Sequence, residues 1–180
     1  EVVFNTAITG YQEIFTDPSY TGQIVVLTYP QIGNYGANFH DSESKRPFIE
    51  GLVVREMSPV TSNWRSEQRA ERFLAEAGIP VIAEVDTRKL VRHLRQRGAM
   101  RGVIASGAHA IAELVKTACD APSMAGLNLV SRVSTKERYE WTEGIEPVSS
   151  SDKIAASDSP TLHVVAYDFG IKRNILRHLV

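Results

Sequence analysis

The sequence has few of the residues that mark several common classes of protein. It holds one cysteine, Cys119, among 180 residues, so an intramolecular disulfide is excluded and a reducing, cytoplasmic location is expected. Its 20 basic and 21 acidic side chains leave a formal net charge of −1, which creates no overall field to attract nucleic acid or an anionic membrane. No apolar run approaches the roughly 18 to 20 residues of a transmembrane helix. We therefore expect neither a nucleic-acid partner nor a membrane location.

The start of the chain also lacks a secretory signal. Residue 1 is Glu, and residues 2–5 have the β-prone composition of a strand rather than the basic and apolar parts of a leader. No methionine precedes this strand. We therefore expect that residues before Glu1 have been trimmed or lie outside the printed sequence.

Signals for metal binding and nucleophilic catalysis are also missing. The five histidines form no pair at the spacing of helical metal ligands, so no metal site is expected. Cys119 falls at the C-terminal end of a predicted helix, where the helix dipole disfavours a reactive thiolate. No Gly-x-Ser-x-Gly elbow occurs. We therefore assign no catalytic residue.

Phosphate-binding motifs are incomplete. Residues 32–38, "IGNYGAN", contain only a Gly-x-x-Gly and read as a turn. Residues 167–172, "YDFGIK", join a strand to a helix through one glycine, without the Gly-x-Gly-x-x-Gly fingerprint of a dinucleotide site.

Predicted strands and helices alternate between residues 51 and 119, which is typical of an α/β layer fold. Asp86 can cap the helix over 86–98, and Gly98 can end it. Ser66 can cap the helix over 66–78. The predicted strands are 2–5, 23–28, 51–55, 81–85 and 100–105, and the predicted helices are 9–16, 66–78, 86–98 and 109–119.

Two of these helices are amphipathic. Leu90, Val91 and Leu94 give the helix over 86–98 an apolar face. The helix over 109–119 is expected to face inward through Ile111, Leu114 and Val115. Between strands, the long loop over 29–44 is of a kind that is often functional.

A change in composition after residue 143 indicates a domain boundary. Residues 143–161 hold five serines and two prolines, which is typical of a linker. Residues 163–180 then show an apolar strand, a glycine turn and a basic helix. One strand-helix unit cannot bury its own apolar face, so we expect it to begin a second domain that leans on the first.

The helix over 86–98 is also strongly basic, since it carries Arg88, Lys89, Arg92, Arg95 and Arg97. This pattern fits a solvated face, with some cations placed favourably near the helix C-terminus. It also fits docking onto phosphate or an acidic protein partner. No aromatic residues interleave, which argues against stacking on single-stranded nucleic acid.

Residues 9–23 hold the densest group of polar and aromatic side chains. Asp17 and Pro18 suit the first two positions of a type I turn. From composition alone, the stretch reads as a capping and turn cluster. The group consists of Tyr11, Gln12, Glu13, Asp17, Ser19 and Tyr20.

Three stretches resemble one family: residues 1–36, 86–105 and 163–180. In the same order, they resemble the small, glutamine-hydrolysing subunit of carbamoyl-phosphate synthetase, and the likeness covers essentially the whole chain. The resemblance implies a layered β/β/α N-terminal domain over 1–142 whose first strands are missing, followed by the linker over 143–161. Residues 162–180 would then be the truncated start of a class I glutamine amidotransferase domain, its first strand-helix unit.

The resemblance also implies an enzyme of the ligase class. The full small subunit hydrolyses glutamine with a Cys-His-Glu triad and supplies ammonia to a large subunit. That subunit makes carbamoyl phosphate, for arginine and pyrimidine synthesis, from bicarbonate and two molecules of ATP with Mg. Cys119 matches no catalytic position of the family. The segment is therefore expected to be inactive alone and to hold no cofactor.

One functional position carries over from the family. There, the serine of the Asp-Pro-Ser-Tyr run reaches across the domain interface to bound L-glutamine, and here that serine is Ser19. Its hydroxyl can both donate and accept a hydrogen bond, as holding a small amino acid requires. Two alternatives stay open: a non-catalytic interaction module that uses the basic helix over 86–98, and, less well supported, a nucleotide-binding domain around 163–180.

Overall fold

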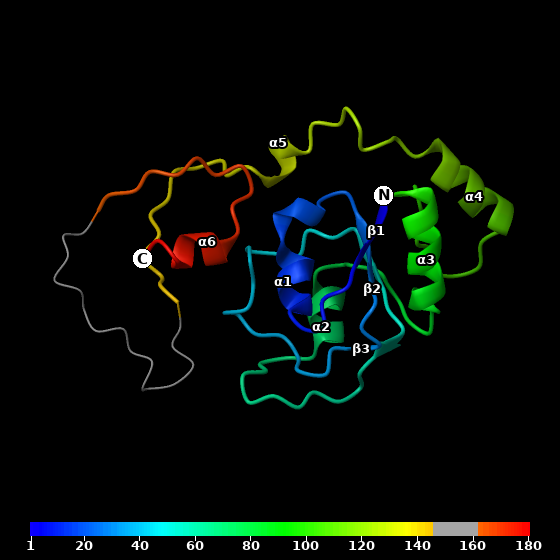
Figure 1. The fold of residues 1–180 in the computed structure, drawn as a ribbon, viewed down its shortest axis with the longest axis horizontal. Coiled ribbons are helices and arrows are strands. Elements are labelled where there is room, and N and C mark those ends of the chain that lie inside the picture. The colour runs from blue at the N-terminus through cyan, green and yellow to red at the C-terminus, as the bar shows by residue number, and fades with distance from the viewer. Residues whose placement is uncertain (146–161) are drawn as a thin grey trace.

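A parallel four-stranded sheet lies at the centre of the fold (Figure 1). The computed structural model describes residues 1–145 and 162–180. The strands stand in the order β1–β2–β4–β6 and are Val2–Asn5, Ile24–Leu27, Gly51–Val53 and Val81–Ile82. Every neighbouring pair is parallel, so each connection must cross over the sheet. The predicted α/β class is thereby confirmed as a mixed α/β fold with a parallel sheet.

Helices and a second, smaller sheet complete the described part of the chain. The helices are α1 (Tyr11–Thr16), α2 (Ala70–Glu76), α3 (Thr87–Arg97), α4 (Ile111–Asp120), α5 (Val130–Val133) and α6 (Arg173–Arg177), with a 3₁₀ turn over Pro18–Tyr20. Strands β3 (Gln31–Ile32) and β5 (Glu56–Met57) pair in parallel. Strand β3 lies inside the stretch over 29–44 that was expected to be a loop throughout.

Strand β2 supplies side chains to both faces of the sheet, because successive residues of a strand point in opposite directions. The core on the first face contains Tyr11, Ile14, Phe15, Val25, Leu27, Leu52 and Leu74. The core on the second face contains Ile24, Val26, Val53, Val91 and Leu94. Helices α1 and α2 therefore cover one face, and α3 covers the other.

Helix α3 forms as its local signals predict. The Asp86 carboxylate accepts the backbone N–H of Lys89 at 2.9 Å, and Gly98 ends the helix with a φ of 84°. Val91 and Leu94 are buried, as expected from their spacing. Helix α2 is shorter than predicted. It begins after Arg69, and Ser66 does not cap it, because the Ser66 hydroxyl donates to the carbonyl of Gln68 instead.

The predicted strand over 100–105 does not form. The segment makes one antiparallel bridge, between Met100 and Val2, and no strand is assigned beyond it. Instead of pairing with a strand, this segment contributes an apolar side chain to packing: Ile104 packs against the core on the second face of the sheet. A pattern of apolar residues alone does not distinguish these two uses.

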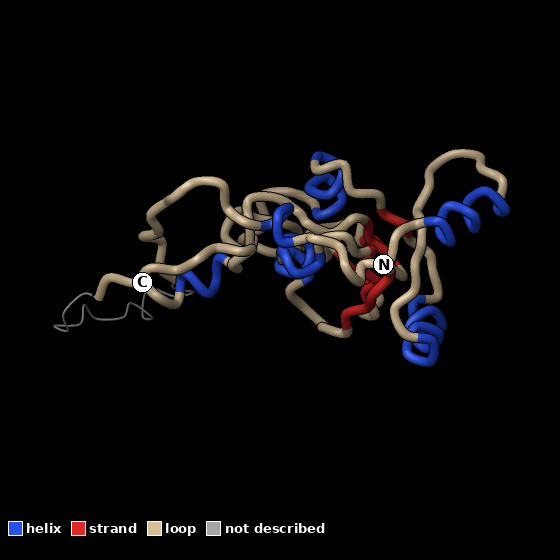
Figure 2. Tube along the Cα trace, turned by 90° about the horizontal axis from the view of Figure 1, so that it is seen from above, coloured by secondary structure: helices blue, strands red, loops and turns tan. Residues whose placement is uncertain are grey.

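The inward face predicted for the helix over 109–119 is wrong. None of the residues of α4 is buried, and Ile111 is 80% exposed. Figure 2 shows the helix at one end of the molecule, away from the strands whose faces form the two cores.

The C-terminal segment forms its predicted helix but not its predicted strand. Residues 163–168 have no strand assignment, and Val165 and Tyr167 are exposed. A strand requires a neighbouring strand that supplies a series of backbone hydrogen bonds. In the described parts of the chain no strand pairs with these residues, and Thr135 donates a single backbone N–H to the Asp168 carbonyl at 3.2 Å. Most of the predicted linker, residues 146–161, lies outside the described residues.

Candidate functional site

The turn that carries Ser19 follows directly from the buried helix α1. Asp17 acts as its cap: one carboxylate oxygen accepts the Ser19 N–H at 2.8 Å, and the Asp17 carbonyl accepts the Tyr20 N–H at 3.1 Å. Pro18 occupies the first position of the 3₁₀ turn, where its fixed φ fits. The predicted turn is therefore confirmed. It leaves the side chain of Ser19 exposed.

Below this turn, Gln12 ties α1 to the long loop. Gln12 is fully buried, and its Oε1 accepts the backbone N–H of Asn38 at 2.9 Å. Its Nε2 donates to the Asn38 carbonyl and to the Ser42 hydroxyl. Because a buried amide needs partners for both ends, these contacts fix the loop against the helix.

Two tyrosines anchor the other end of α1. The rings of Tyr11 and Tyr35 stack with centroids 3.9 Å apart, and the Tyr35 hydroxyl accepts the Tyr11 N–H at 2.8 Å. The Tyr11 hydroxyl donates to the carbonyl of Gly36 at 2.6 Å. Burial raises the pKa of both tyrosines above the usual range, so both remain neutral hydrogen-bond donors.

Glu13, which also lies on α1, carries a half-buried carboxyl group. Burial raises the pKa of Glu13, and the charges of Asp41 and Glu43 push it in the same direction. Within the described residues, its buried Oε2 atom has no hydrogen-bond partner. The carboxyl is thus held in a place that disfavours its charge.

The C-terminal segment lies against the Ser19 turn. The Lys172 ammonium is 3.5 Å from the second carboxylate oxygen of Asp17. A Cβ on Gly170, which has a φ of 98°, would lie 3.2 Å from the Cβ of Pro18. The turn that contains Gly170 therefore packs closely against the Ser19 turn. Glycine permits this close approach because it has no Cβ.

Glu43, in the loop over 29–44, accepts three hydrogen bonds from the C-terminal segment. Its carboxylate accepts the backbone N–H of Asn174 at 3.0 Å and the Asn174 side-chain amide at 2.8 Å. Its carbonyl accepts the N–H of Arg173 at 2.9 Å. The residue is only 6% exposed. Sequence reasoning missed Glu43, because nothing in a serine-rich loop marks one acid among its neighbours as buried.

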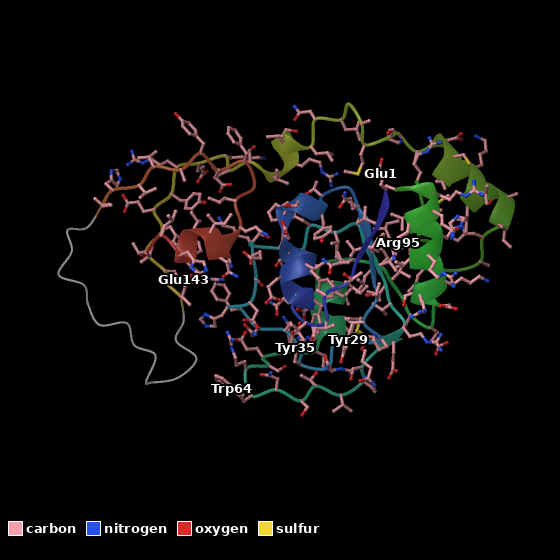
Figure 3. The ribbon with its side chains drawn as sticks, in the orientation of Figure 1. Glu1, Tyr29, Tyr35, Trp64, Arg95 and Glu143 are labelled. Carbon is pink, nitrogen blue, oxygen red and sulfur yellow. The ribbon has the colours of Figure 1, made fainter. Side chains whose placement is uncertain are left out.

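An ion pair and a hydrogen-bonded carboxylate also hold the C-terminal segment. Arg177, 6% exposed, donates through Nε to the Glu143 carboxylate at 3.0 Å; Figure 3 shows Glu143 close to α6. The Asp168 carboxylate accepts the N–H groups of Gly170 and Ile171 and the hydroxyl of Tyr139. Although burial opposes it, this set of hydrogen bonds lowers the pKa of Asp168.

The basic face of α3 lies on the opposite side of the molecule, as the position of Arg95 shows (Figure 3). Within the described residues, its cations are exposed and none forms an ion pair: Arg88, Lys89, Arg92, Arg95 and Arg97. The face does not touch the Ser19 turn.

Three other kinds of site have little support in the described residues: a reactive cysteine, a metal centre and a membrane-spanning helix. Cys119 is exposed on α4, far along the chain from the contacts above. No group of His, Cys, Asp and Glu in residues 1–145 and 162–180 could hold a metal ion. Across the same residues, no helix has the length and apolar character to cross a membrane.

These contacts define an α/β domain whose Ser19 turn is joined by polar contacts to a segment more than a hundred residues away. A family model described as "Carbamoyl-phosphate synthase small chain, CPSase domain" matches residues 1–104. The chain therefore belongs to the family of carbamoyl-phosphate synthase small chains, which confirms the resemblance seen in the sequence.

Curated relatives extend the match to the whole chain. The carbamoyl phosphate synthase small chain of Syntrophotalea carbinolica is 52% identical over 180 residues, covering 100% of this chain and 48% of the relative. That of Thioalkalivibrio sulfidiphilus is 50% identical, covering 100% and 47%. That of Chlorobaculum tepidum is 51% identical over 181 residues, covering 99% and 45%. The chain spans about half the length of the curated relatives it matches.

Proposed function

We propose that this chain is the N-terminal half of a small subunit of glutamine-dependent carbamoyl-phosphate synthetase. In that enzyme, a complete small subunit hydrolyses glutamine, and a large subunit uses the released ammonia, bicarbonate and two molecules of ATP to make carbamoyl phosphate. The observation that carries this proposal is the family match over residues 1–104, extended by relatives about 50% identical along the entire chain.

Within such a subunit, Ser19 contributes to glutamine binding rather than to bond breaking. Its side chain is exposed, and its backbone is fixed by the Asp17 carboxylate. A hydroxyl on a rigid turn is well suited to hold one polar end of a small amino acid, because little conformational freedom is lost on binding. The nearby approach of Gly170 brings the C-terminal segment to the same turn.

The segment itself supplies no catalyst and no cofactor. Hydrolysis of an amide by a thiolate needs an activated cysteine with a histidine and an oxyanion hole, and such a set would lie outside these residues. ATP and Mg would be bound by the large subunit, which is the protein partner of this one. The setting is cytoplasmic, as the single cysteine suggests.

The domain layout is part of the same proposal: an N-terminal domain over 1–142, a linker over 143–161 and the start of an amidotransferase domain over 162–180. The β3–β5 sheet supports a layered β/β/α arrangement for the complete N-terminal domain. Helices on both faces of the four-stranded sheet do not support it.

The proposal is tested by reconstitution. The full-length small subunit that carries this segment is expected to give glutamine-dependent synthesis of carbamoyl phosphate when mixed with the large subunit, whereas residues 1–180 give none above the large subunit alone. Synthesis with residues 1–180 would show that the catalytic centre lies inside this chain. Failure of the full-length subunit would remove the proposed function.

A second function, protein interaction through α3, is favoured by one observation. Its five cations are exposed and, within the described residues, have no acidic partner. Replacing Arg88 and Arg92 by Ser should weaken binding of an acidic protein in a salt-dependent way, if this function is real. Binding to duplex DNA with a steep salt dependence would instead favour a nucleic-acid role.

A further inference from the structure

Glu43 satisfies the start of α6 from a distant part of the chain. The first backbone N–H groups of a helix have no partner within the helix. Here Arg173 and Asn174 open α6, and Glu43 accepts both of their N–H groups, one through its carbonyl and one through its carboxylate. The second carboxylate oxygen takes the side-chain amide of Asn174. The cap lies 131 residues from the helix that it serves.

On its other side, Glu43 is tied to the residue that ends α1. Its N–H donates to the Thr16 hydroxyl at 2.8 Å, and that hydroxyl donates in turn to the Gln12 carbonyl at 2.8 Å. Ser44 adds a bond from its own hydroxyl to the Thr16 carbonyl at 2.6 Å. Thr16 is fully buried. It precedes the Ser19 turn by one residue, so a shift of Glu43 would be transmitted to that turn.

These contacts form an unbroken route from α6 through Glu43 and Thr16 to the Ser19 turn. Within the described residues, two direct contacts also join the turn to the C-terminal segment: the Asp17–Lys172 pair and the approach of Gly170 to Pro18. The pair is longer and more exposed than the Glu43 contacts, and exposed ion pairs constrain geometry weakly. Buried, charge-assisted hydrogen bonds constrain it more strongly.

We propose that Glu43 is a positioning residue that fixes the orientation of the C-terminal segment relative to Ser19. Glu43 is remote from the proposed glutamine contact and acts through Thr16. This inference rests on the proposed function for its effect on glutamine, but the junction itself is independent of it. The decisive group is the carboxylate, because only a double acceptor can satisfy both donors of Asn174.

The first test is Glu43→Gln in the full-length small subunit, assayed with the large subunit. The amide side chain introduced at position 43 keeps the size of the original side chain. Its nitrogen, however, is a donor where the carboxylate had an acceptor, and it would face a donor of Asn174. The glutamine KM is expected to rise about tenfold, the factor that one charge-assisted hydrogen bond supplies, while kcat changes less than about twofold. Glu43→Ala would also open a buried cavity, so it is the less informative variant.

Two controls separate positioning from general loss of stability. Glu76→Gln removes an exposed acid that pairs with Arg72, four residues away on the same helix, and should leave the glutamine KM unchanged. Asn174→Ala removes the side-chain amide that donates to the Glu43 carboxylate and leaves the two backbone donors in place. The double variant should be no worse than about twofold beyond the poorer single variant, because both changes act on one junction.

A second readout needs no enzymatic activity. Hydrogen exchange at the amides of Arg173 and Asn174 should be faster in Glu43→Gln and unchanged in Ser19→Ala. A normal KM together with normal exchange in Glu43→Gln would overturn the proposal. Faster exchange with a normal KM, while Ser19→Ala raises the KM, would show that the junction does not position Ser19. Faster exchange when neither variant alters the KM would instead count against the proposed function.

Discussion

The side chain of Gln12 and the backbone of Asn38 satisfy one another in both directions. The Asn38 N–H donates to Gln12 Oε1 at 2.9 Å, and the Gln12 amide nitrogen donates back to the Asn38 carbonyl. Both residues are buried, and they join α1 to the loop that also carries Glu43. This pair therefore stabilises the base on which the candidate site stands.

Replacing Gln12 by Ala should destabilise the protein. The change leaves the N–H and carbonyl of Asn38 buried without their partner, which costs about 2 to 4 kcal/mol in the free energy of unfolding. Urea unfolding followed by circular dichroism measures this change. Gln96→Ala, on the exposed side of α3, is the matched control and should change the free energy by less than about 0.5 kcal/mol. Equal effects for the two variants would contradict this role of Gln12.

Gly36→Ala should be far more harmful than Gly78→Ala. Both glycines have a positive φ, 75° and 71°, so both variants meet the left-handed strain of about 1 to 2 kcal/mol. A Cβ at Gly36 would also clash with the Ser66 hydroxyl and lie 2.7 Å from the Gln68 carbonyl, whereas a Cβ at Gly78 meets nothing within 4 Å. The difference in Tm between the two variants isolates this steric contribution. Similar Tm values would show that the loop relaxes around the added methyl group.

Glu13 should make the stability of the protein depend on pH. Its pKa is raised by burial in the folded state, so the unfolded state ionises first as the pH rises. Folding is therefore weakened as the pH rises from the usual range of a glutamate, about 4.3, through the raised folded value. The neutral variant Glu13→Gln is expected to be more stable than the parent at pH 7, with a smaller gain at pH 4. Unfolding curves at the two pH values measure this; an equal difference at both would contradict a raised pKa.

Local signals allowed some of these features to be predicted from the sequence. Asp86 and Gly98 mark the ends of α3, and Asp17 with Pro18 marks the turn, because each effect depends on residues a few positions apart. The resemblance of whole stretches identified the family. In the same way, the spacing of Val91 and Leu94 predicted the buried side of α3.

Features that depend on distant partners were not predictable. The apolar spacing of α4 predicted a buried face, but burial also requires an element to pack against, and Ile111 is 80% exposed. The strand predicted at the start of residues 163–180 similarly lacks a neighbouring strand among the described residues. The contact between Glu43 and Asn174 spans 131 residues, so no local pattern could reveal it. Ser19 as a glutamine contact stays a prediction.

The most direct test of the account is the effect of Ser19→Ala on the kinetics of the full-length small subunit with its large subunit. Loss of a hydroxyl that binds glutamine should raise the glutamine KM about tenfold and leave kcat within about twofold. Ser106→Ala, at an exposed serine outside the candidate site, is the matched control and should leave both constants unchanged. An unchanged glutamine KM in Ser19→Ala would contradict the central claim that this turn forms part of the glutamine site.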